Sequence, residues 1–191
     1  MTLAQALKII ILGWPAFHGD VETEAQREAR IEAVAVDIAE AAEEQPNRAR
    51  VLDAAAAAAV VAKFETHFAE YVGGGRCREG RYRCDPDENG NPQSLTYWQL
   101  KRKACKAAHE LPDGSREQQK AAAKCAVRLW FSARRRCANA PSAGSDTIAG
   151  AFSGYGGGIV CSLPSSAKRA ESWRTTRAKL AALTRKENTT P

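Results

Sequence analysis

Apolar residues recur at helical spacing along much of the chain, and this pattern predicts a mainly α-helical protein. Within residues 21–44 they fall three or four positions apart, at Ile31, Val34, Ile38 and Ala42, as on the buried face of an amphipathic helix. Asp20 is the expected N-cap of this helix, and Pro46-Asn47 is expected to end it.

The segment 52–72 predicts a helix of the core. It contains six consecutive alanines at 54–59, followed by Val60 and Val61. Alanine has the highest intrinsic helix propensity, and its small side chain lets neighbouring helices approach closely. The three glycines at 73–75 are expected to end this helix.

The remaining segments predict further helices around a short irregular region. In chain order we expect a loop at 76–94 with a turn at 87–91 that can join two short strands, helices at 97–110 and 115–136, a Gly/Ser-rich stretch at 138–158, and a basic surface helix from 165 onward. We therefore expect three parts: an N-terminal helical arm at 1–50, a central α domain with a small β part at 51–165, and a basic helical tail at 166–191.

The 191-residue chain carries a formal net charge of +6 that is unevenly distributed. Residues 1–50 carry −4 and the remainder +10, and 168–186 contains seven Lys or Arg against Glu171 alone. This field favours a polyanionic partner, namely nucleic acid, an anionic membrane face or an anionic cell-wall polymer; a solvated basic face is the alternative. No run approaches the roughly 18 apolar residues of a spanning helix, which excludes an integral membrane protein.

Six cysteines lie between residues 77 and 161, and none lies before them. They form no CxxC pair, and no histidine is placed to complete a zinc-finger pattern, so we expect no metal site. Their even number predicts three disulfides and a compartment outside the reducing cytosol; six reduced thiols are the alternative. Among the possible connectivities we expect Cys77–Cys84 across a loop, Cys105–Cys125 between neighbouring helices, and Cys137–Cys161.

The apolar stretch at 9–17 follows Lys8 and resembles the hydrophobic region of a signal peptide. Trp14-Pro15 interrupts it, however, and no small-x-small cleavage site follows, so we expect the segment to be retained. A protein that needs oxidation but has no clear signal fits an extracytoplasmic location, in the periplasm or cell wall, or a place in a bacteriophage virion.

Glu65 is the leading candidate for a chemical role. On a helix it shares a face with the residues three and four positions away, and all of them are apolar: Val61, Ala62, Phe68 and Ala69. Such neighbours desolvate a carboxylate and favour its protonated form, which a general acid requires near neutral pH. The alternative is that Glu65 pairs with one of the many arginines. His67 shares its face with polar residues and is expected at the surface.

Three short segments give Glu65 a context. An apolar helix ends in Phe64-Glu65-Thr66-His67-Phe68; after a loop, Ser94-Leu95-Thr96-Tyr97-Trp98-Gln99-Leu100 is expected to open the next helix; and Gly154-Tyr155-Gly156-Gly157 lies farther on. In this order they resemble the lysozyme-like lytic transglycosylase family, most closely a subset with a Trp before the Gln of the second element and several cysteines. The resemblance covers about residues 52–161 and implies a lysozyme-like fold.

The resemblance gives each matching residue an expected role. Glu65 takes the catalytic position, with Thr66 in place of the common Ser. Ser94 and Gln99 match the second element and would contact the N-acetyl groups and ring substituents of a glycan. Tyr155 matches the third element and would supply a flat apolar surface against a sugar ring.

The reaction that the resemblance implies is cleavage of peptidoglycan strands between N-acetylmuramic acid and N-acetylglucosamine. Glu65 would protonate the glycosidic oxygen and then deprotonate either the muramoyl 6-hydroxyl, which gives a 1,6-anhydro product, or water. The first outcome needs one carboxyl group and no cofactor. A hydrolytic lysozyme normally needs a second carboxylate, and an exposed turn explains Asp85, Asp87 and Glu88 better, so we expect a lytic transglycosylase.

Two residues keep alternatives open. Trp98 would either offer a second flat surface to a sugar or pack in the core at the start of a helix. Thr96 stands where the family has Gly, and a positive φ would strain it. The main alternative function is therefore an inactive lysozyme-like virion protein, with residues 1–50 contacting other virion proteins. A nucleic-acid binder that uses the basic tail is less favoured, because no recognisable nucleic-acid-binding module accompanies that tail.

Overall fold

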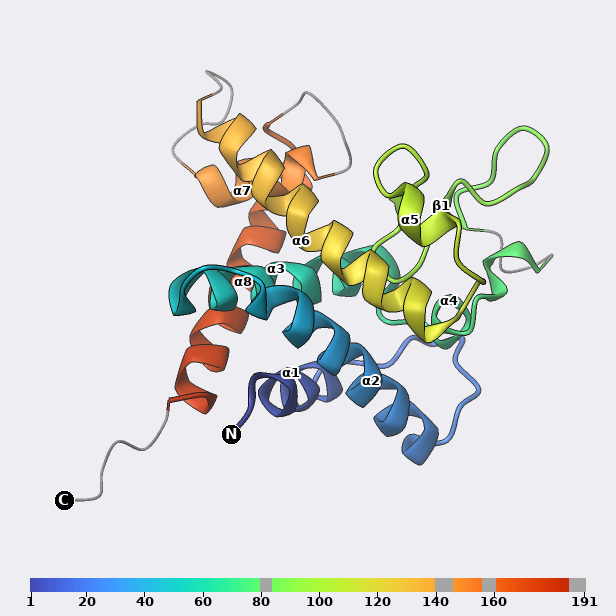
Figure 1. Cartoon of the computed structure of the whole chain (residues 1–191), viewed down its shortest axis with the longest axis horizontal. Helices are drawn as coiled ribbons and strands as arrows, with labels where there is room; N and C mark the ends of the chain where they lie inside the picture. Colours follow the sequence, from blue (N-terminus) through green and yellow to red (C-terminus); the bar gives the residue numbers. More distant parts are fainter. Residues whose placement is uncertain (80–83, 140–145, 156–160, 186–191) are drawn as a thin grey trace.

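The structure, a computed structural model, describes residues 1–79, 84–139, 146–155 and 161–185. Helices dominate it, and the described residues include one small antiparallel sheet, so the predicted class, mainly α with a small β part, is confirmed (Figure 1). The strands do not flank the turn at 87–91 as predicted, since they pair within 94–101, and only an isolated bridge between Pro86 and Pro92 closes that turn. The helices are α1 (Leu3–Leu12), α2 (Glu24–Glu43), α3 (Arg48–Thr66), α4 (Glu70–Gly73), α5 (Lys106–His109), α6 (Arg116–Ala138), α7 (Thr147–Gly154) and α8 (Pro164–Leu183), with a 3₁₀ turn at Arg76–Arg78; the strands are β1 (Ser94–Leu95) and β2 (Leu100–Lys101).

Helix α3 is the centre of the molecule. Helices α1, α2, α6 and α8 all contact it, and Figure 1 shows it in the middle of these helices. Every residue from 54 to 62 is at most 1% exposed. Because most of these side chains are alanine methyl groups, neighbouring helices can pack closely against every face of α3. The predicted core helix is therefore present.

The predicted limits of this helix, 52–72, are wrong at both ends. It begins earlier because the Asn47 side chain caps it, accepting a hydrogen bond from the Arg50 N–H at 3.0 Å. It ends at Thr66 rather than at the glycines, because His67 and Phe68 adopt φ values of 51° and 55°. The turn carries the Phe68 ring into the core and leaves Phe64 and Glu65 of the last helical turn half-buried.

Helix α2 lies where the sequence predicts a helix, but its cap is different. The Thr23 hydroxyl accepts a hydrogen bond from the Gln26 N–H, and the Gln26 side chain accepts one from the Thr23 N–H. This reciprocal arrangement satisfies two free N–H groups at once. Asp20, the predicted cap, instead accepts a hydrogen bond from the Glu70 N–H at 2.8 Å.

The predicted helix at 97–110 is wrong. Strands β1 and β2 form a hairpin in which Leu95 is paired with Leu100, and only the single turn α5 is helical farther on. Thr96 and Gln99 adopt φ values of 68° and 47°, which a continuous helix cannot contain. The hairpin turn carries two adjacent rings, Tyr97 and Trp98, into the core together.

The C-terminal region also differs from the prediction. Part of the expected Gly/Ser-rich stretch, Thr147–Gly154, is helix α7, whereas residues 140–145 and 156–158 of that stretch lie outside the described residues. Helix α8 is present where the basic surface helix is expected, but it buries one face in the core while the other stays exposed. Its Trp173 and Leu180 are buried, and the Trp173 ring stacks on Trp130 with the ring centroids 5.9 Å apart.

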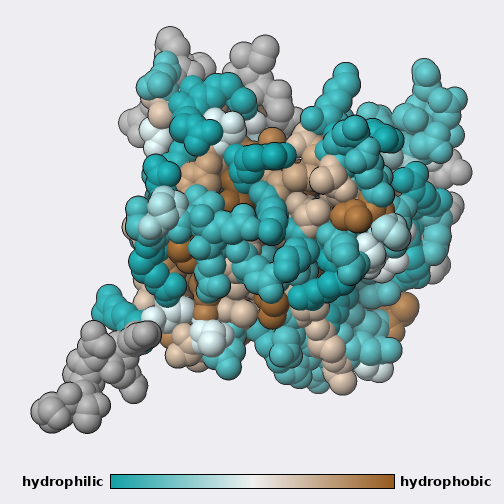
Figure 2. All heavy atoms as spheres, in the orientation of Figure 1, coloured by the Kyte–Doolittle hydropathy of each residue, from teal (hydrophilic) through white to brown (hydrophobic). Residues whose placement is uncertain are grey.

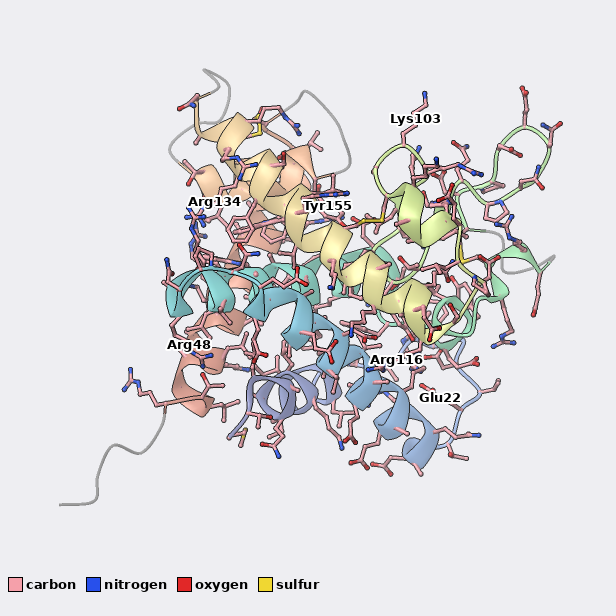
Figure 3. All side chains as sticks on the ribbon, viewed as in Figure 1. Glu22, Arg48, Lys103, Arg116, Arg134 and Tyr155 are labelled. Carbon is pink, nitrogen blue, oxygen red and sulfur yellow. A yellow bond between two sulfur atoms is a disulfide. The ribbon has the colours of Figure 1, made fainter. Side chains whose placement is uncertain are left out.

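The carboxylate of Asp53 joins three helices. From α3 it pairs with Arg134 of α6, at 2.9 Å, and with Arg177 of α8, at 2.5 Å; Figure 3 labels Arg134 where α6 passes α3. The Asp53 carbonyl oxygen also accepts a hydrogen bond from the Trp173 indole N–H at 3.1 Å. Asp53 therefore holds both neighbours against the central helix.

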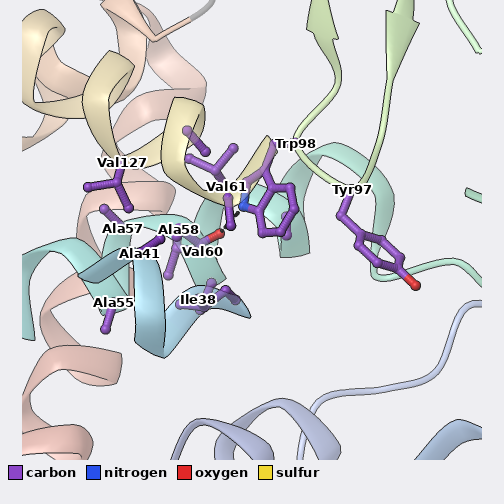
Figure 4. Close-up of a cluster of buried hydrophobic side chains, with 14 of the residues drawn as sticks. Ile38, Ala41, Ala55, Ala57, Ala58, Val60, Val61, Tyr97, Trp98 and Val127 are labelled. Atoms are coloured by element: carbon purple, nitrogen blue, oxygen red, sulfur yellow. Dashed lines mark hydrogen bonds between the residues drawn. The ribbon is translucent and has the colours of Figure 1, made fainter. Parts of the chain in front are cut away.

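The buried apolar residues form one core that runs from Leu3 of α1 to Leu180 of α8. The expected arm at 1–50 and the described part of the expected tail at 166–191 thus pack into the same core as the segment between them. Figure 4 shows its centre, where Ile38 of α2 and Val127 of α6 lie around Val60 of α3.

Three disulfides link Cys77 to Cys84, Cys105 to Cys125 and Cys137 to Cys161, which confirms the predicted pairing. Disulfides persist in oxidising compartments. Among the described residues, no helix is both long enough and apolar enough to cross a membrane.

We expect Asp53→Ala to lower the free energy of unfolding by about 2–4 kcal/mol, because it leaves two arginines without their partly buried partner. Urea unfolding with the disulfides intact measures this value. Glu110→Ala is the matched control, since it breaks an exposed pair with Lys106 and should change stability by less than about 0.5 kcal/mol. Equal effects of the two substitutions would contradict the role of Asp53.

Asp37 of α2 gives a prediction about pH. Its side chain is 1% exposed, and this burial raises its pKa to about 6. The guanidinium of Arg116, 3.1 Å away, opposes the shift but does not cancel it. Figure 3 labels Arg116 at the start of α6. The folded protein therefore keeps a proton between about pH 4 and 6 that the unfolded chain releases. The stability that Asp37 contributes should fall as pH rises through this window and stay constant above it.

The measurement is the difference in free energy of unfolding between wild type and Asp37→Asn at pH 4, 5, 6 and 7. We expect wild type to lose up to about 3 kcal/mol relative to the variant across the window. A difference that rises with pH, or does not change, would show that Asp37 has no raised pKa.

Candidate active site

One cleft collects most of the predicted site residues. It has a volume of about 290 Å³ and is lined by Glu65, Asp85, Ser94, Gln99 and Tyr155, together with apolar residues of the hairpin and α6. The five named residues come from three segments distant in sequence: the end of α3, the hairpin with its preceding loop, and the end of α7. The structure thus brings together the three segments on which the resemblance rests.

Glu65 lies in the last turn of α3, and its carboxylate is not surrounded by apolar groups alone. Arg169 of α8 donates a hydrogen bond of 2.5 Å to Glu65 Oε1, and the side chains of Arg169 and Glu65 are 19% and 27% exposed. The same guanidinium lies 5.4 Å from the centre of the Phe64 ring. The predicted apolar environment of Glu65 is therefore wrong, and the alternative, pairing with an arginine, is what the structure contains.

Thr66 ties the end of α3 to the hairpin. Its buried hydroxyl lies 3.1 Å from the carbonyl oxygens of both Ala62 and Tyr97, and its one proton is shared between them. A hydroxyl at this position therefore fixes the hairpin turn next to Glu65.

The hairpin turn itself is strained. Thr96, where the resemblance expects Gly, has a φ of 68°, a region that β-branched residues avoid. Its hydroxyl is buried and has no hydrogen-bond partner among the described residues. Gln99 closes the turn, because its side-chain amide donates to the Thr96 carbonyl at 3.1 Å.

Of the three loop carboxylates, Asp85 is the one that lines the cleft. Its Oδ2 accepts a hydrogen bond of 3.2 Å from the Ser94 hydroxyl and lies 3.4 Å from the Lys101 ammonium. Asp87 instead holds the turn at 87–91, where hydrogen bonds from the N–H groups of Asn91 and Asn89 lower its pKa. Glu88 is exposed and does not line the cleft.

Tyr155 forms a wall of the cleft. It is 5% exposed, and its hydroxyl donates a long hydrogen bond of 3.4 Å to the Trp98 carbonyl. Burial, and then the nearby Glu65 charge, raise the pKa of Tyr155 well above its usual value, so the phenol stays neutral. Figure 3 labels this side chain beside α6.

Trp98, predicted as a surface for sugars, is a core residue. It is fully buried, and its indole N–H donates to the Ala58 carbonyl at 2.9 Å (Figure 4). No face of the ring is open to a ligand, so the core-packing alternative holds for Trp98. The ring instead fastens the hairpin to α3.

Arg169 is the site residue that the sequence analysis missed. It belongs to the basic run at 168–186, and helical spacing around Glu65 cannot reveal a partner 104 positions away. Within the described part of the chain, no cluster of three or more His, Cys, Asp or Glu side chains could hold a metal ion.

Comparison of the chain with known protein families, curated proteins and solved structures finds no match. The arguments about function therefore depend on the site itself.

The strain at Thr96 gives a prediction. Thr96→Gly should stabilise the protein by about 1 kcal/mol relative to Thr96→Ala, because glycine adopts a positive φ without the steric clash of a Cβ atom. Alanine removes the unpartnered hydroxyl but keeps the Cβ, so the difference between the two variants isolates the backbone strain. Urea unfolding measures both, and an alanine variant at least as stable as the glycine variant would contradict it.

Proposed function

We propose that this protein cleaves peptidoglycan strands as a lytic transglycosylase, with Glu65 as its acid and base. The observation that carries the proposal is that Glu65, at the end of a buried helix, lines a cleft with Ser94, Gln99 and Tyr155. The confirmed disulfides support a site of action outside the cytosol, in the periplasm or cell wall or on a virion.

The proposed reaction uses one carboxyl group twice. Protonated Glu65 gives its proton to the glycosidic oxygen, and the bond from that oxygen to the muramoyl C1 breaks. The Glu65 carboxylate then takes the proton of the muramoyl 6-hydroxyl while the oxygen of that hydroxyl forms a bond to C1. The product is a 1,6-anhydro sugar, and the carboxyl group is protonated again for the next cycle.

The Arg169 contact sets a condition on this mechanism. While the guanidinium donates to Glu65 Oε1, that carboxylate is engaged as an ion-pair acceptor. We propose that a glycan entering the cleft displaces Arg169, so that Glu65 can take up the proton it must donate. The positive charge of the chain would also concentrate it at an anionic cell wall.

A hydrolytic lysozyme is the second candidate, and Asp85 is the observation that favours it. A carboxylate that shares a cleft with the acid can stabilise positive charge on the sugar or activate water. Ser94 and Lys101 hold Asp85 at the cleft, as such a role requires. The products of the reaction distinguish the two candidates.

The test is digestion of purified peptidoglycan by the oxidised protein, followed by mass spectrometry of the released muropeptides. We expect products one water lighter than ordinary reducing-end muropeptides. Glu65→Gln should reduce their release by at least about 100-fold, since glutamine can still accept the Arg169 hydrogen bond but cannot transfer the proton. Asp85→Asn is the matched control and should retain most activity.

Two other outcomes are informative. Reducing-end products that disappear in both Glu65→Gln and Asp85→Asn would replace the transglycosylase with a lysozyme. No release by the folded, oxidised wild type from several wall chemotypes would contradict both enzymes and favour an inactive virion protein.

A further inference from the structure

A second, larger groove is lined by residues none of which lines the Glu65 cleft. It has a volume of about 510 Å³ and is lined by the end of α2, the start of α3, and residues of α5 and α6. Leu129 of α6 faces the Glu65 cleft, whereas Arg128 and Phe131 face this groove. Figure 2 views the molecule from the side on which α2 and α6 lie in front.

The groove is rich in positive charge that carboxylates do not neutralise. Lys124 pairs with Glu44 at 2.6 Å. Among the described residues, no carboxylate oxygen lies within 4.0 Å of Arg50, Arg128 or Arg135. Arg128 donates a hydrogen bond to the weak acceptor Cys125 Sγ, at 3.6 Å. Three uncompensated guanidinium groups around one groove repel one another, and an anionic ligand would relieve that repulsion.

The spacing of the arginines indicates a ligand with more than one anionic group. Arg128 and Arg135 are seven residues apart on α6, which places them on one face about 10 Å apart along the helix axis. That separation exceeds the span of the oxygens of one phosphate. Arg50 reaches the groove from α3. Because guanidinium groups match phosphate oxygens bidentately, a chain that carries several phosphates fits this arrangement.

The groove lacks a free surface for stacking nucleobases. Phe131 is the one aromatic side chain among its described lining residues. The Arg50 guanidinium lies over its ring at 5.9 Å, and the Trp130 ring packs against it with the centroids 5.1 Å apart. Single-stranded nucleic acids bind through stacking on aromatic side chains as well as through phosphates. A phosphate chain without bases therefore fits better, and alanines at 41, 107 and 121 leave room for it.

We propose that this groove binds a polyol-phosphate chain, the kind of phosphodiester polymer that is attached to some bacterial cell walls. This proposal rests on the proposed function only in naming the bacterial cell wall as the source of the polymer. Since the groove and the Glu65 cleft share no lining residue, both can be occupied at once. Binding in the groove would hold the protein at the wall while the cleft engages a glycan strand.

The test measures binding of fluorescently labelled poly(glycerol phosphate) to the full-length, oxidised protein by anisotropy. Replacing Arg50, Arg128 and Arg135 together by Gln should weaken binding at least 10-fold. The charge-matched control replaces three exposed cations elsewhere, Arg102, Lys103 and Lys168, and should weaken it less than threefold. If the triple variant does not fold, the three single Arg→Gln variants should each weaken binding two- to fivefold.

Three results would overturn the proposal. Equal losses in the two triple variants would mean that only the overall charge attracts the polymer. If pyrophosphate bound as tightly as poly(glycerol phosphate), the groove would recognise two linked phosphates and not a polymer chain. Tighter binding of an oligothymidylate with the same number of phosphates would replace the polyol polymer with a nucleic acid. Glu65→Gln should bind the polymer as wild type does, so failure of the proposed catalysis would leave this result readable.

Discussion

The close packing of helices around the consecutive alanines of α3, residues 54–59, is the constraint on which the rest of the structure depends. Methyl side chains let neighbours come so near that the indoles of Trp98 and Trp173 donate hydrogen bonds to α3 carbonyl oxygens, those of Ala58 and Asp53. One tryptophan belongs to the hairpin and the other to α8, so two distant parts of the chain are anchored to one helix. Larger side chains in this run would force the neighbours outward and break both contacts.

The same packing determines where the cleft forms. Helix α3 ends at Thr66 because the next two residues turn the chain inward, which leaves Glu65 at the open end of the helix. The hairpin is fastened to that end by the Trp98 indole and the Thr66 hydroxyl. Three segments that are far apart in sequence therefore meet around the Glu65 carboxylate: the end of α3, the strained hairpin turn and the end of α7.

Local patterns were sufficient for some of these features and insufficient for others. Periodicity predicts α2 and α6 because a single face of each meets the core, and the even number of cysteines predicts three disulfides. The apolar spacing at 97–110 fits a helix equally well, and it is the positive φ of Thr96 and Gln99 that makes a hairpin. The arrival of Arg169 at Glu65 is a tertiary event, so periodicity around Glu65 indicates an apolar environment that the fold replaces with an ion pair.

Helix α8 is the last of the described helices in chain order, yet it covers one side of α3 and supplies both Arg169 and Arg177. During synthesis, the earlier helices can meet one another before α8 has left the ribosome, but that side of α3 stays open to water until it arrives. The Cys137–Cys161 bond can likewise form only after Cys161 has been made. The order of the helices along the chain therefore delays closure of this side of the core, and with it the Glu65 ion pair, until α8 has been made.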